Sequence, residues 1–145
     1  MRRPVPHISF MVANAKEVAK GGASFDQILD CTSEGVAHTH PFREYVTHTP
    51  PTGSNDHNWT SGDLDAIVKK VSQWLEEDQW VLIHCGRGVS RSTCAAAAVL
   101  LHLGEAKTVE QAVEMCRDPY RVPVKTALSS LRSWWNEKRQ MELPL

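Results

Sequence analysis

The sequence predicts an α/β fold, with one domain built on a central, mostly parallel sheet flanked by helices. Short apolar segments of strand length alternate along the chain with longer segments whose apolar residues recur at helical spacing. The apolar residues 80–83 lead through a glycine-containing loop into a run of helix formers at 93–103. The 145 residues contain no internal repeat, low-complexity segment or linker, so we expect a single domain over residues 1–145.

The first fifty residues are expected to supply three strands. Residues 8–12 form an apolar run typical of a first strand, and Asn14 then caps a short helix over 15–20. Residues 25–32 mix large apolar side chains with polar ones and are interpreted as a second strand. Residues 45–49 alternate like a third strand, which ends at two prolines.

Residues 50–62 form the longest segment without periodicity, and a loop of this length in a small domain is often functional. Thr60 or Ser61 then caps a helix that ends near Asp78. The apolar face of this helix has six residues at helical spacing: Leu64, Ile67, Val68, Val71, Trp74 and Leu75. The next apolar run is a strand that delivers the chain to Cys85.

The last third of the chain is expected to be helical. Gly104 ends the helix that follows the glycine-containing loop. Thr108 and Gln111 form a capping box at the start of the next helix, and Pro123 stands at the start of a final one. The polar tail, residues 136–145, is expected to fray.

Composition restricts the partners of the chain. Hydrophobic residues make up 41%, charged residues 23%, and the net charge is −1, as in an ordinary globular protein. Without a positive field, we expect neither nucleic acid nor membrane as a partner. No apolar run suits a signal peptide or a bilayer span, and a cytoplasmic location is expected. The protein is expected to be a monomer. Four scattered cysteines are too few for a disulfide scaffold.

The loop between the strand and the helix at 93–103 has the features of an anion site. Backbone N–H groups converge, unpaired, where such a loop enters a helix N-terminus. A cysteine at the start of the loop, here Cys85, has its thiolate stabilised by these donors, which lowers its pKa. Arg91, at the other end, offers a planar fork matched to two phosphate oxygens. We therefore predict a nucleophile and an oxyanion-binding site in one loop.

Residues 84–92, His-Cys-Gly-Arg-Gly-Val-Ser-Arg-Ser, resemble the signature loop of the cysteine-dependent protein phosphatases, and most closely its dual-specificity form. The resemblance implies hydrolysis of phosphotyrosine, and of phosphoserine or phosphothreonine, in a phosphorylated protein. It implies a cysteinyl-phosphate intermediate and requires no cofactor and no metal. It also implies that His84 orders the loop rather than transferring protons. The substrate phosphate is then bound by Gly86, Arg87, Gly88, Val89, Ser90 and Arg91.

Each candidate catalytic residue also has a purely structural explanation. Cys85 is the candidate nucleophile, although most cysteines are buried structural residues. Arg91 is the candidate phosphate ligand, although an arginine at a helix start is often only solvated. Ser92 is able to donate a hydrogen bond to the Cys85 sulfur, which helps the sulfur to leave phosphorus in the second step of the reaction. Its structural alternative is a hydrogen bond within its own helix.

The general acid has three candidates upstream of the nucleophile. Asp63 and Asp65 already have a structural explanation, because acids in a first helical turn complement the helix dipole. Asp56 has no such role and lies in the long loop, where dual-specificity phosphatases carry their acid. We therefore assign the acid to Asp56, with Asp63 as the alternative and an ordinary turn residue as the plain explanation of Asp56.

The other cysteines and the histidines have less specific patterns. Cys31 lies at the end of an expected strand, at a place where some phosphatases have a cysteine that forms a protective disulfide with the nucleophile. A buried core cysteine is an equally good interpretation of Cys31. Cys94 and Cys116 lie on apolar helical faces and are expected in the core. Four histidines have no regular ligand spacing, so no metal site is predicted. These are His38, His40, His48 and His57.

Two other functions remain open at this stage. One is a phosphatase for a non-protein substrate, such as a phosphoinositide, an inositol phosphate or an RNA 5′-phosphate, and Arg87 is the one additional loop charge that favours it. The other is a phosphate-binding pseudophosphatase, which the intact Cys85, Arg91 and Ser92 disfavour. The chain also departs from the family pattern, with Val124 where an asparagine is frequent and Ala127 where a phenylalanine is frequent.

Overall fold

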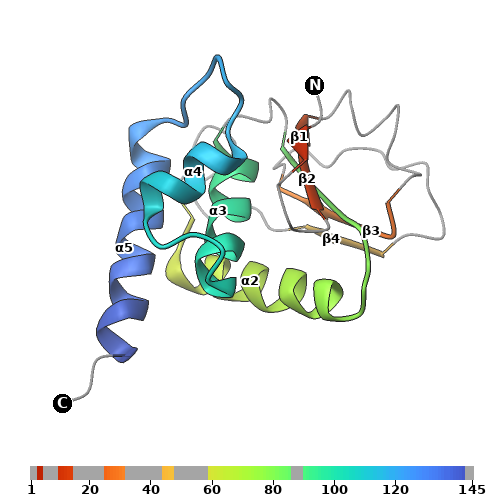
Figure 1. Ribbon diagram of the computed structural model, residues 1–145, viewed down its shortest axis with the longest axis horizontal. Coiled ribbons are helices and arrows are strands. Elements are labelled where there is room, and N and C mark those ends of the chain that lie inside the picture. Colours follow the sequence, from red (N-terminus) through yellow and green to blue (C-terminus); the bar gives the residue numbers. More distant parts are fainter. Residues whose placement is uncertain are drawn as a thin grey trace.

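The computed structural model describes residues 3–4, 10–14, 25–31, 44–47, 59–85 and 90–142 (Figure 1). Its five strands form one sheet in the order β1-β2-β5-β3-β4. The strands are β1 (Arg3–Pro4), β2 (Phe10–Asn14), β3 (Gln27–Asp30), β4 (Glu44–Thr47) and β5 (Val81–Cys85). Strands β2, β5, β3 and β4 run parallel, and only β1 pairs antiparallel, at one edge. The predicted mostly parallel sheet is confirmed, while the helix expected over 15–20 lies outside the described residues.

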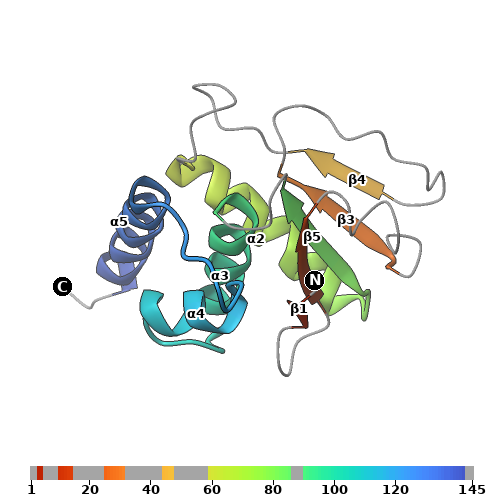
Figure 2. The ribbon, with the colours of Figure 1, turned by 90° about the horizontal axis from the view of Figure 1, so that it is seen from above.

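Four helices follow in the described part of the chain, and Figure 2 shows α4 and α5 beyond α3, away from the sheet. They are α2 (Ser61–Glu76), α3 (Arg91–Leu103), α4 (Val109–Cys116) and α5 (Lys125–Glu142). Helix α3 contacts β5 and β2, α2 contacts β5, and α4 and α5 pack on α3. None of the described helices is long and apolar enough to cross a membrane.

Helix α3 is the centre of the packing. All of its residues from Arg91 to Leu101 are buried. A helix that is apolar on every side is suited to such a position, and the four alanines at 95–98 let neighbouring helices approach closely. The predicted C-cap is confirmed, because Gly104 adopts a left-handed φ of 76° and its N–H donates to the carbonyls of Leu100 and Leu101.

Helix α2 begins and ends as the sequence predicts. Thr60 is its N-cap: the Thr60 hydroxyl accepts from the Asp63 N–H, and the Asp63 carboxylate accepts from the Thr60 N–H. The helix ends at Glu76, and Asp78 then takes a φ of 58°, which aspartate tolerates better than most residues. Of the six residues expected on its apolar face, five are buried and Leu75 is half-buried.

Two predictions for the C-terminal helices differ from the structure. Thr108 caps α4 as expected, but the Gln111 side chain accepts from the Lys107 N–H, so only half of the predicted capping box forms. The expected fraying of the tail is wrong for residues 136–142, because α5 continues to Glu142. Contacts with α2 explain this extension: Ser61 donates a hydrogen bond to Glu137, and Lys138 pairs with Asp65 at 2.7 Å.

Candidate active site

Strand β5 delivers Cys85 to the C-terminal edge of the sheet. In the parallel register Cys85 pairs with Asn14 of β2, and His84 pairs with Asp30 of β3. The Cys31 N–H donates to the His84 carbonyl at 2.8 Å, which extends this side of the ladder by one residue. In open parallel sheets, ligands bind outside the carboxyl ends of the strands. Cys85 is therefore at the edge where a site is expected.

Helix α3 begins six residues after Cys85 and brings Arg91 and Ser92 to the start of the helix. Arg91 is only 7% exposed and Ser92 is fully buried. Burying a guanidinium is costly unless it has partners, so a solvated surface role for Arg91 is wrong. The Cys85 side chain and residues 86–89 lie outside the described part of the structure.

Ser90 contributes differently from a usual helix N-cap. Its φ and ψ of −106° and −62° are near-helical rather than extended, and its side chain makes no capping bond to α3. The Ser90 hydroxyl instead accepts a hydrogen bond from the Val124 N–H at 3.0 Å. The first amides of α3 are thus left uncapped by this serine, as an anion-binding helix N-terminus requires.

Trp59 is a site residue that sequence reasoning missed. It is 3% exposed, and its indole Nε1 donates to the Arg91 carbonyl at 3.1 Å. This bond joins the end of the long loop to the first residue of α3, 32 positions away. The only signal in the sequence was a lone tryptophan at the end of an aperiodic segment, directly before the capping residue Thr60.

We expect the Trp59→Phe variant to lose about 1 kcal/mol of unfolding free energy, because one buried hydrogen bond disappears. We also expect a fall of about tenfold in kcat/KM, since a small displacement of Arg91 weakens phosphate alignment. Urea unfolding and steady-state kinetics measure the two effects. Trp135→Phe is the matched control, because the Trp135 indole nitrogen is buried without a hydrogen-bond partner among the described residues. Equal kinetic losses in both variants would contradict a positioning role.

The structure assigns structural contacts to two of the three acid candidates. The Asp63 carboxylate is part of the α2 capping box. Asp65 accepts from the Trp134 indole at 3.0 Å and pairs with Lys138 at 2.7 Å. Partial burial raises the Asp65 pKa, but hydrogen bonds from Lys138 and Trp134 and the charge of Lys138 outweigh it, so the pKa is lowered. A lowered pKa is unfavourable for a general acid at neutral pH. Asp56 lies outside the described residues.

The Asp65 contacts predict a pH-dependent contribution to stability. A lowered folded-state pKa stabilises the fold above the pKa of the unfolded chain, and this stabilisation is lost as the pH falls through the folded-state value. At neutral pH we expect Asp65→Asn to lower the unfolding free energy by up to about 1 kcal/mol, because the pair is half exposed. Urea unfolding of wild type and variant should converge at acid pH. The control Glu105→Gln, an exposed site, should differ from wild type at neither pH; a loss in Asp65→Asn that persists in acid would contradict the ion pair.

The remaining cysteines are buried. Cys94 and Cys116 lie in the core, as predicted. Cys31 is also fully buried, with its backbone beside the end of β5, and its disulfide with Cys85 stays a prediction. Within the described ranges, no three His, Cys, Asp or Glu side chains gather as a metal site would require. The four histidines considered above lie outside those ranges.

A cysteine at a strand end and a buried arginine at the next helix start are the arrangement expected of a strand–loop–helix anion site. Comparison with known families gives a more specific result. A family model described as "Dual specificity phosphatase, catalytic domain" matches residues 11–137. The chain belongs to the dual specificity phosphatase catalytic domain family.

Two curated relatives match part of the chain. The chain is 31% identical over 83 residues to cyclin-dependent kinase inhibitor 3 from Rattus norvegicus, and 32% identical over 83 residues to the Mus musculus protein of the same name. Each match covers 57% of this chain and 34% of the relative. The chain therefore spans about a third of the length of these relatives.

Solved structures show the same fold over nearly the whole chain. Human DUSP28 superposes with a TM-score of 0.80 at 14% identity, over 98% of this chain and 100% of that one. PTPMT1 in complex with PI(5)P superposes with a TM-score of 0.78 at 15% identity, over 98% and 99% of the two chains. Tk-PTP in its active form gives 0.75 at 17% identity, over 93% and 96%.

Proposed function

We propose that the protein hydrolyses phosphate monoesters of phosphorylated proteins, on tyrosine and on serine or threonine, through a cysteinyl-phosphate intermediate at Cys85. One observation supports this most strongly. Arg91 is buried at the first position of α3, directly after the loop that begins at Cys85, and Trp59 binds its carbonyl. An arginine held in this way is pre-organised to bind an oxyanion, which is the main requirement of phosphoryl transfer.

In the first step the Cys85 thiolate attacks phosphorus in line with the leaving oxygen. The sulfur–phosphorus bond forms as the phosphorus–oxygen bond breaks, and Asp56 gives its proton to the departing oxygen. Arg91 and the amide groups of residues 86–91 hold the equatorial oxygens, where negative charge is concentrated.

In the second step water attacks phosphorus and the sulfur departs as a thiolate. Asp56, now ionised, takes a proton from the water, which restores the starting form of the acid. Ser92 donates a hydrogen bond to the leaving sulfur and stabilises its charge. Inorganic phosphate is released, and no cofactor is consumed.

Two features support Asp56 as the acid. Asp63 and Asp65 are already bound to Thr60 and to Lys138, whereas Asp56 precedes Trp59 by three residues. Three residues span at most about 11 Å, which is the greatest distance between the Asp56 and Trp59 Cα atoms, and the Trp59 indole in turn binds the first residue of α3. This chain connection to the start of α3 is the second feature that supports Asp56.

A substrate panel tests the proposal. The arms are an aryl phosphate, matched phosphotyrosine, phosphoserine and phosphothreonine peptides, a phosphoinositide and an RNA 5′-phosphate. We expect turnover of the aryl phosphate and the phosphopeptides. Hydrolysis confined to the phosphoinositide or to RNA would contradict the protein-substrate assignment, and phosphate binding without turnover in any arm would contradict enzymatic activity.

A further inference from the structure

The loop that joins α4 to α5, residues 117–124, presents large side chains to solvent. Tyr120 is 94% exposed and Val122 is 65% exposed, although most large apolar residues described in this chain are buried. An exposed tyrosine and an exposed valine two positions apart on one short loop offer apolar area to a partner. We call residues 117–124 the α4–α5 loop.

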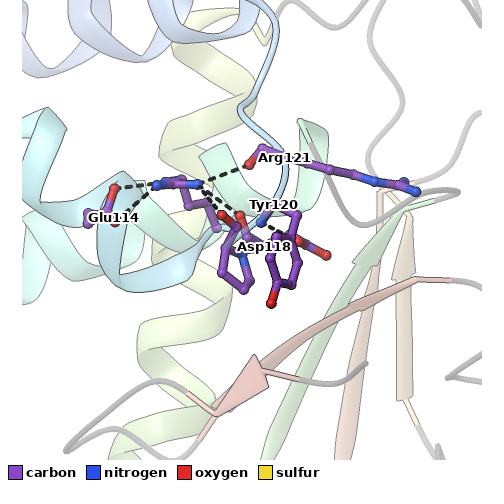
Figure 3. Close-up of polar contacts among 6 residues, drawn as sticks. Glu114, Asp118, Tyr120 and Arg121 are labelled. Carbon is purple, nitrogen blue, oxygen red and sulfur yellow. Dashed lines mark hydrogen bonds and ion pairs between the residues drawn. The ribbon is translucent and has the colours of Figure 1, made fainter.

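Arg117 fixes the shape of this loop. Its guanidinium pairs with the Glu114 carboxylate, through Nε at 2.7 Å and Nη2 at 3.1 Å. Its Nη1 also donates to the carbonyls of Asp118, Pro119 and Arg121, at 3.0, 3.3 and 3.4 Å (Figure 3). One arginine thus binds the start, middle and end of the turn. These bonds restrict the backbone of the loop in advance, so less conformational entropy is lost when a partner binds.

Two further bonds tie the α4–α5 loop together and to the site. The Asp118 carboxylate accepts from the Tyr120 N–H at 2.8 Å, which fixes the backbone of the exposed tyrosine. The Val124 N–H donates to the Ser90 hydroxyl, at the end of the phosphate-binding loop. Val124 is four residues from Tyr120, so this bond ties the C-terminal end of the α4–α5 loop to the residue that directly precedes α3.

The two arginines of the loop differ in their charge balance. Glu114 neutralises Arg117, as the raised Arg117 pKa beside this carboxylate also indicates. Arg121 and Lys125 are exposed, and among the described residues neither side chain forms an ion pair like that between Arg117 and Glu114. Figure 3 shows the Arg121 side chain extending away from Glu114, on the opposite side of the Arg117 network. The surface therefore offers the two exposed positive charges of Arg121 and Lys125, together with the Asp118 carboxylate that accepts from the Tyr120 N–H.

We propose that the α4–α5 loop binds the peptide segment that flanks the phosphorylated residue, and selects acidic side chains there through Arg121 and Lys125. Tyr120 supplies the apolar contact area. This proposal rests on the proposed function, because it names the sequence that the phosphatase prefers around its target. A tyrosine and an arginine on a pre-organised loop have the composition of an interface hot spot. A second phosphorylated residue next to the target residue pairs with Arg121 and Lys125 in the same way as a carboxylate.

A peptide suits this surface better than an anionic membrane does. Membrane recognition by charge uses clusters of about four to eight basic residues, whereas this surface has two exposed ones, Arg121 in the loop and Lys125 at the start of α5. The chain as a whole has a net charge of −1, which adds no long-range attraction to an anionic bilayer. A single exposed tyrosine next to two basic residues fits one extended peptide.

Two phosphotyrosine peptides that differ only by Glu or Gln at the flanking positions test the proposal. We expect wild type to prefer the Glu peptide in kcat/KM, mainly through KM. We expect Arg121→Gln to reduce this preference about three- to fivefold, as the loss of one exposed charge pair allows. Arg121→Lys should retain it, and added salt should weaken it in wild type. Tyr120→Ala should raise KM for both peptides.

Arg139→Gln is the matched control, because Arg139 is exposed in the last turn of α5, and it should retain the wild-type preference. An equal preference in wild type and Arg121→Gln, with thermal midpoints also equal, would overturn the proposal. So would loss of binding to phosphatidylserine vesicles in Arg121→Gln without a change in peptide preference. The wild-type rate on an aryl phosphate separates the two failures: no turnover there would reject the proposed function, whereas turnover without acidic preference would reject only the α4–α5 loop proposal.

Discussion

The Cys85→Ser variant is expected to hydrolyse an aryl phosphate at least about ten thousand times more slowly than wild type. A serine hydroxyl stays protonated where a cysteine thiol at a helix N-terminus ionises, so the nucleophile is lost. Binding should survive, because Arg91 and the loop amides are unchanged. We expect the Kd for inorganic phosphate, measured by calorimetry, to change by no more than a few-fold.

Cys116→Ser is the control for this experiment. Cys116 is a fully buried cysteine on α4 and has no place in the proposed chemistry. Its variant should retain turnover, with a modest loss of stability from burying a hydroxyl. Comparable activity in wild type and Cys85→Ser would contradict the assignment of the nucleophile.

The Asp56→Asn variant is expected to lower kcat about a hundred- to ten-thousandfold on a phosphotyrosine peptide. An acid donates only while it is protonated, so wild-type kcat should fall as the pH rises through the pKa of the acid. An asparagine has no such proton, and the variant should lack this basic limb. The loss should be smaller on an aryl phosphate with an acidic leaving group, because that oxygen departs without a proton.

Asp63→Asn and Asp65→Asn are the matched controls for Asp56. Their carboxylates bind the Thr60 N–H and the Lys138 ammonium, so these variants should change stability and leave the basic limb of kcat in place. If Asp63→Asn removes the basic limb while Asp56→Asn keeps it, the acid is Asp63 and the capping box opens during catalysis.

Local signals in the sequence predicted most of the fold. Some signals determine local structure within a few residues of the chain, so they can be recognised in a single sequence. Examples are the apolar run of β5, the alanines of α3 and the helix-ending Gly104. The same holds for Thr60, whose hydroxyl bonds a residue three positions away. The site prediction depended on the same kind of signal, because the loop from Cys85 to Ser92 is continuous in the chain.

Contacts between distant residues were not predictable in this way. Trp59 bonds a carbonyl 32 positions away, and Lys138 pairs with an aspartate in α2. The polar residues after 135 have no periodic apolar signal, so their helix was not predicted. Partners on α2 stabilise it instead. The Arg117 network required the folded turn, because three of its acceptors are backbone carbonyls.

The most direct test of the central claim is mass spectrometry of the acid-quenched protein during turnover of an aryl phosphate. The proposed mechanism predicts one phosphoryl group on the peptide that contains Cys85, and none after quenching the Cys85→Ser variant. It also predicts a larger phosphorylated fraction in Asp56→Asn, because the second step then lacks its base. Steady hydrolysis by wild type with no phosphoryl group on Cys85, or with one on another residue, would contradict the proposal.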